Sequence, residues 1–107
     1  MQVYADHAAT TRMSAAAIQA MLPGMYDIYG NPSSLYTLGQ QAAQALQQAR
    51  ETVASCLNAS PAEIYFTSGG SEADNQAIFT AAKLGERKGK KHIISTAFEH
   101  HAVLHTL

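Results

Sequence analysis

Residues 66–75 read Phe66-Thr67-Ser68-Gly69-Gly70-Ser71-Glu72-Ala73-Asp74-Asn75, and this stretch decides the predicted fold. The run at 64–67 is β-branched and aromatic, which is typical of a buried strand. The two glycines break the run, and a helix is predicted from about Ser71 to Leu84. A buried strand that turns directly into a helix indicates an α/β architecture.

The glycine turn has the chemistry of an anion-binding site. Free N–H groups and the dipole at a helix N-terminus favour negative charge, glycine lets the backbone come close, and Ser71 adds a hydroxyl donor. The turn is neither a Walker A loop, since no Gly-Lys-Ser/Thr follows, nor a dinucleotide fingerprint, since the Gly-x-Gly-x-x-Gly spacing is absent. An ordinary strand-to-helix turn with Ser71 as its cap is the alternative interpretation.

Helices and strands are also predicted before and after this turn. Ser14 is the expected N-cap of a first helix, which Pro23 and Gly24 should end or bend. A longer helix is predicted at about 38–57, with Asn58 closing it in the left-handed conformation. The remaining predictions are a capped single turn at 60–63, a helix that opens at 99–101, and strands at 3–5, 64–67 and 92–95. This order predicts parallel strands with flanking helices.

Composition narrows the classes of function. The 107 residues are 47% hydrophobic and 14% charged, with a net charge of -1, so general nucleic-acid binding is not expected. No apolar run approaches the roughly 20 residues that span a bilayer, and the N-terminus lacks signal-peptide features, so a cytoplasmic protein is expected. Residues 101–107 begin a helix without a stop signal, which suggests part of a longer chain. The single cysteine, Cys56, excludes an internal disulfide and is expected to be a buried structural thiol.

Histidines cluster after the last predicted strand. His100 would stand at the carboxyl end of a parallel strand, where α/β proteins bind ligands, and its ring could stack on a flat aromatic molecule. A surface or capping histidine is the equally simple interpretation. His101 and His105 are spaced to chelate a metal on one helix face, but no third ligand is near, so no metal site is predicted.

Four stretches in order resemble one family: Asp6-His7-Ala8-Ala9-Thr10-Thr11, Gly30-Asn31-Pro32-Ser33-Ser34, residues 66–75, and Glu99-His100-His101-Ala102-Val103. The chain resembles the N-terminal segment of a NifS/IscS-type cysteine desulfurase, within the class V aminotransferase group of pyridoxal 5'-phosphate (PLP) enzymes. The resemblance implies an α/β fold, the N-terminal part of a fold-type I PLP-dependent transferase with an incomplete parallel-type sheet. Residues 1–14 would belong to the small domain, and 15–107 would begin the large PLP-binding domain.

The resemblance also implies the site. Gly70 and Ser71 match the turn that holds the cofactor phosphate, and His100 matches the histidine that stacks on the pyridine ring. The Schiff-base lysine and the persulfide cysteine of the family lie beyond this length, so no catalytic residue is expected within the segment, and the 107 residues alone are expected to be inactive.

The implied reaction converts L-cysteine to L-alanine and passes sulfur to a cysteine persulfide, for iron–sulfur clusters, tRNA thiolation or other acceptors. The expected partners are L-cysteine, a sulfur-acceptor protein and a second copy in a homodimer, with no membrane. The alternatives are another class V PLP enzyme, such as a selenocysteine lyase or an aminotransferase, and a short non-catalytic binding or assembly module.

Overall fold

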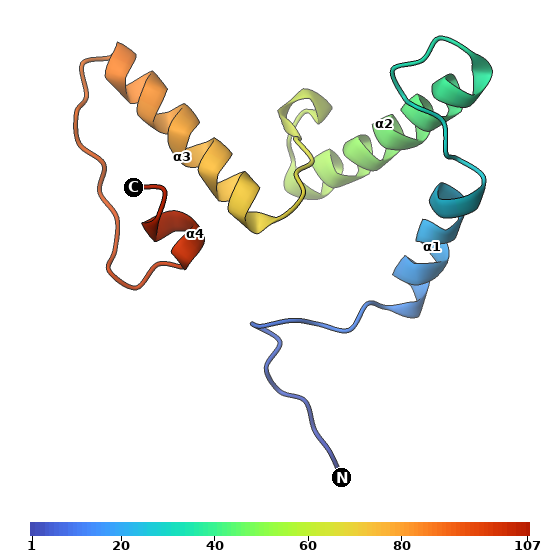
Figure 1. Cartoon of the computed structure of the whole chain (residues 1–107), viewed down its shortest axis with the longest axis horizontal. Coiled ribbons are helices and arrows are strands. Elements are labelled where there is room, and N and C mark those ends of the chain that lie inside the picture. Colours follow the sequence, from blue (N-terminus) through green and yellow to red (C-terminus); the bar gives the residue numbers. More distant parts are fainter. The chain divides into compact units, whose positions relative to one another are not determined.

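Figure 1 shows the computed structural model, which describes residues 1–107. Its regular elements are all helical: α1 (Ala15–Tyr26), α2 (Thr37–Leu57), the short 3-10 turn η1 (Pro61–Glu63), α3 (Gly70–Arg87) and α4 (His101–Leu104). The chain divides into an N-terminal unit, residues 1–64, and a C-terminal unit, residues 65–107. None of the helices combines the length and the apolar character that crossing a membrane requires.

The structure shows no sheet, so the expected incomplete parallel sheet is not confirmed. Residues 3–5, 64–67 and 92–95 carry no strand assignment. A strand exists only when a neighbouring backbone accepts and donates its hydrogen bonds, and these segments have no such neighbour. Their apolar side chains therefore stay open, with Tyr65 70% and Ile94 94% exposed.

Helix α1 begins where the sequence predicts and ends later. The Ser14 hydroxyl accepts a hydrogen bond from the N–H of Ala17 at 3.1 Å, which confirms the N-cap. Pro23 and Gly24 are expected to end or bend the helix; it continues past Pro23 to Tyr26, so the predicted end is wrong and the bend stays a prediction. Proline removes only its own donor, and the Pro23 carbonyl still accepts from the N–H of Asp27 at 2.9 Å, which closes one more turn.

Helix α2 organises the N-terminal unit. Its buried residues are Gly39, Ala42 and Ala54, and it contacts η1. The Arg50 guanidinium donates to the carbonyl of Ile64, which ties the end of this unit to the helix. Cys56 is exposed, so the predicted buried thiol is wrong, because nothing in the unit covers its face of α2.

Asn58 closes α2 in the left-handed conformation, with φ 53° and ψ 41°, as predicted. Replacing it with alanine is expected to lower the free energy of unfolding by about 1 kcal/mol, because a Cβ without a polar side chain is strained at positive φ. Urea unfolding followed by circular dichroism measures the change. Asn58→Gly, the matched control, should leave stability unchanged or higher, and an Asn58→Ala variant as stable as the wild type would contradict this account.

The C-terminal unit consists of α3, the segment after it and α4. Gly89 has φ 70° and ends α3, with the N–H of Lys90 donating to the Gly85 carbonyl at 3.0 Å. This is the backbone pattern of a Schellman closure, which turns the chain back beside the helix. Helix α4 contacts α3 within the unit.

Candidate functional site

The N-terminus of α3 carries free backbone donors. Helix α3 begins at Gly70 with Gly69 as its N-cap, and no side chain caps it. The first bond of the helix runs from the N–H of Ala73 to the Gly69 carbonyl, at 3.2 Å. The N–H groups of residues 70–72 therefore have no acceptor within the helix. Ser71 is the second helical residue rather than the cap, so the interpretation as an ordinary serine-capped turn is wrong.

The space in front of these donors is open. A Cβ built on Gly69 or on Gly70 would meet no atom within 4 Å. Gly69 is extended, with φ 172° and ψ 178°, a conformation open to any residue. Nothing within the chain therefore requires two glycines here, whereas a group approaching the N–H donors would need the room that side chains would take. The exposed Ser71 hydroxyl adds a donor beside them. This donor set fits a phosphate group.

The Glu72 carboxylate is hydrogen-bonded to Ser68 rather than to these donors. Its Oε2 accepts from the Ser68 hydroxyl at 2.6 Å and from the Ser68 N–H at 2.7 Å. The two hydrogen bonds hold the pKa of Glu72 below its ordinary value of 4.5, and the bond from the Ser68 hydroxyl has the larger effect. The carboxylate thus binds the residue before the glycines, and the N–H groups of the first helical turn stay available.

Glu72 should therefore make the turn sensitive to acid. Because its pKa is lower in the folded chain, its stabilising effect is complete above pH 4.5 and is lost as pH falls through the folded pKa. Carboxyl-carbon NMR should give a titration midpoint below 4.5. Ser68→Ala should return the midpoint toward the ordinary value, because it removes the larger cause. A wild-type midpoint at or above 4.5 would contradict the assignment.

His100 caps α4. Its Nδ1 accepts from the N–H of Ala102 at 3.1 Å, so the interpretation as a capping histidine is confirmed. The lone pair of Nδ1 lies in the ring plane, and this hydrogen bond therefore uses neither face of the ring. Stacking on a flat ligand stays a prediction that the cap leaves open.

Asn75 connects the two parts of the candidate site. Its Nδ2 donates to the carbonyl of Ser71 at 2.8 Å and to the carbonyl of Ala102 at 3.4 Å. The structure thus brings the α3 turn and the helix capped by His100 into one hydrogen-bonded arrangement within the C-terminal unit. Sequence reasoning did not single out Asn75, although its position four residues after Ser71 places both on one helix face.

The histidine pair of this unit, His101 and His105, forms no metal centre. The rings of His101 and His105 stack with centroids 5.2 Å apart, and no group of three His, Cys, Asp or Glu residues is arranged to hold a metal ion.

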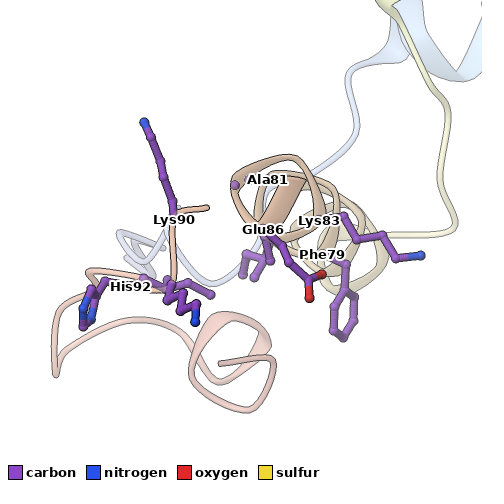
Figure 2. Close-up of a pocket in the computed structure, with 11 residues that line it drawn as sticks. Phe79, Ala81, Lys83, Glu86, Lys90 and His92 are labelled. Atoms are coloured by element: carbon purple, nitrogen blue, oxygen red, sulfur yellow. The ribbon is translucent and has the colours of Figure 1, made fainter. Parts of the chain in front are cut away.

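A groove of about 680 Å³ lies between α3 and residues 90–93. Figure 2 shows four of the residues that line it, Phe79 and Glu86 on α3 and Lys90 and His92 on the segment that follows. None of the candidate cofactor residues lines this groove.

Comparison with known proteins decides the family, because residues 3–107 match the model of the Aminotransferase class-V family. The chain belongs to the class-V aminotransferase family. Curated members similar to it are named "Cysteine desulfurase IscS", from Clostridium botulinum, with 50% identity over 98% of this chain, and from Methanosarcina thermophila, with 50% identity over 97%. The solved structure of a NifS-like protein is 42% identical over 99% of the chain, with a TM-score of 0.89.

The matches cover nearly all of this chain but only part of each class-V relative. The chain accounts for 26% of the length of each curated relative and 29% of the solved chain. It therefore spans about a quarter of the proteins it matches.

Proposed function

We propose that this class-V chain serves a PLP-dependent cysteine desulfurase as its N-terminal segment. In the reaction, the C–S bond of L-cysteine breaks, its sulfur forms an S–S bond with a protein cysteine to give a persulfide, and the carbon accepts a proton to give L-alanine. The observation that carries the proposal is the uncapped α3 N-terminus, with its open glycines and Ser71, hydrogen-bonded through Asn75 to the helix that His100 caps. The names of the similar proteins support the same reaction.

The residues divide the binding of PLP between them. The N–H groups of Gly70 and Ser71 and the Ser71 hydroxyl would hold the phosphate, where the helix dipole favours negative charge. His100 would present a ring face to the pyridine ring. PLP, when bound, supplies an electron-withdrawing ring that stabilises negative charge on the substrate. The contribution of this segment is thus to bind and orient the cofactor.

The remaining roles belong to residues outside the segment. The lysine that bonds to the cofactor and the cysteine that carries the persulfide are proposed to lie in the rest of the enzyme. Residues 1–14 are proposed to join the small domain, and residues 15–107 to begin the large one. The sulfur-acceptor protein, the homodimer and the cytoplasmic location stay predictions.

The test uses the native polypeptide purified intact from its source and incubated with PLP and L-cysteine. Alanine and sulfide should form in the presence of a reductant, and trapping with an alkylating reagent should detect a protein persulfide. A matched sample of the 107-residue chain should release no more sulfide than free PLP. An intact polypeptide that makes no alanine would contradict the proposed function.

The same assay separates the cysteine desulfurase from the other class-V enzymes proposed as alternatives. The match to the class-V family model names the family and not one reaction within it. A selenocysteine lyase would act on selenocysteine and form no persulfide with cysteine. An aminotransferase would produce a keto acid in place of alanine and sulfide. Sulfide release by the 107-residue chain above the free-PLP control would contradict the expectation that the segment is inactive alone.

A further inference from the structure

The amide of Asn75 is placed where only a double donor can serve. Both carbonyls that it contacts, those of Ser71 and Ala102, are acceptors, and one NH₂ group supplies a hydrogen to each. Asn75 is half-buried, so water replaces these bonds less readily than at an open surface position. A carboxylate at this position would face two carbonyl oxygens without a hydrogen to offer.

The second of these bonds leads directly to His100. The backbone of Ala102 accepts from Asn75 at its carbonyl and donates from its N–H to Nδ1 of His100. The Thr106 hydroxyl donates to the same Ala102 carbonyl at 2.7 Å, which fixes the peptide group further. The orientation of the His100 ring and the path of the first turn of α3 therefore depend on the same amide group.

We propose that Asn75 is a positioning residue, which sets the His100 ring at a fixed separation from the phosphate turn at Gly70 and Ser71. The inference rests on the proposed function, because the two parts need a fixed separation only if one rigid ligand binds both. Asn75 itself does not touch the cofactor. It acts through Ala102 on His100 and through the Ser71 carbonyl on the turn.

The test measures PLP affinity of the intact native polypeptide by absorbance titration. Asn75→Leu, which keeps the shape and removes both donors, should weaken PLP binding about tenfold. Asn75→Gln, which keeps the two hydrogens, should recover most of the affinity. The control is Gln76→Leu, which changes an exposed amide on the next residue of α3 and should bind PLP as the wild type does.

A double-mutant cycle separates positioning from general loosening of the fold. If Asn75 acts in part through His100, the loss of PLP affinity in the variant with both Asn75→Leu and His100→Ala should be smaller than the sum of the two single losses. Simple addition of the two losses would overturn the proposal, as would an Asn75→Leu variant with wild-type affinity. Thermal unfolding of each variant identifies any that has lost its fold. If Asn75→Leu has lost its fold, the PLP affinity of Asn75→Gln is compared with that of the wild type instead.

A second measurement keeps this proposal distinct from the proposed function. Hydrogen exchange detected by mass spectrometry should show faster exchange of residues 100–106 in Asn75→Leu than in the wild type. A wild-type protein that binds no PLP would overturn the proposed function and the cofactor role of Asn75 together. Unchanged exchange in the variant would overturn the hydrogen-bonded link itself, whatever the outcome with PLP.

Discussion

Replacing Ser71 with alanine is expected to weaken PLP binding by about ten- to one-hundredfold, since a hydrogen bond to a charged group contributes about 1.5–3 kcal/mol. The Ser71 side chain is exposed, and only its carbonyl is used within the chain, by Asn75. The substitution should therefore leave the thermal midpoint unchanged while removing one donor to the phosphate. Absorbance titration of the intact polypeptide with PLP measures the loss.

Two further serine variants make this result specific. Ser71→Thr keeps the hydroxyl and should bind PLP within a few-fold of the wild type. Ser68→Ala changes a nearby serine whose hydroxyl is occupied by Glu72, and it should bind PLP more tightly than Ser71→Ala. Equal affinity of Ser71→Ala and the wild type would remove Ser71 from the phosphate site.

A large loss of stability is expected from Gly39→Ala, at about 3 kcal/mol, because overpacking against backbone cannot relax cheaply. A Cβ on Gly39 would lie 2.7 Å from the Asn31 carbonyl oxygen and would overlap the carbonyl of Ser34. The loop before α2 passes directly against its first turn at this point. Gly30 faces the same restriction, because its Cβ would overlap the Leu38 carbonyl.

Gly24→Ala is the matched control for this prediction. Its Cβ would meet nothing within 4 Å, and it lies within α1, where alanine is favoured over glycine by about 1 kcal/mol. Urea unfolding of the intact polypeptide should therefore show Gly24→Ala at or above wild-type stability and Gly39→Ala well below it. Similar stability of the two variants would contradict the close packing at Gly39.

Local sequence signals predicted the helices because their causes are local. The Ser14 cap, the left-handed Asn58 and the capping box of Ser60 with Glu63 each act within a few residues, and each is present. The predicted strands are not confirmed, for the opposite reason. The run at 64–67 has strand-forming side chains, but a sheet also needs partner backbone from elsewhere.

In the candidate site too, the features with local causes were predictable and those that depend on distant residues were not. The open turn at Gly70 and Ser71 follows from two glycines before a helix, and the capping by His100 from a side chain one residue ahead of α4. The role of Asn75 could not be predicted, because it depends on Ala102, which lies 27 residues away. The exposure of Cys56 was missed because an apolar helix face indicates a preference for burial but not what covers it.

The small interior of the chain has a calorimetric consequence. Its buried hydrophobic residues are Ala42 and Ala54 alone, while large side chains such as Phe79 and Ile94 are already in contact with water. The heat-capacity change of unfolding arises mainly from newly hydrated apolar surface, and here little is left to hydrate. Scanning calorimetry of the 107 residues should therefore show a heat-capacity step well below the ordinary one of about 12–15 cal/mol/K per residue.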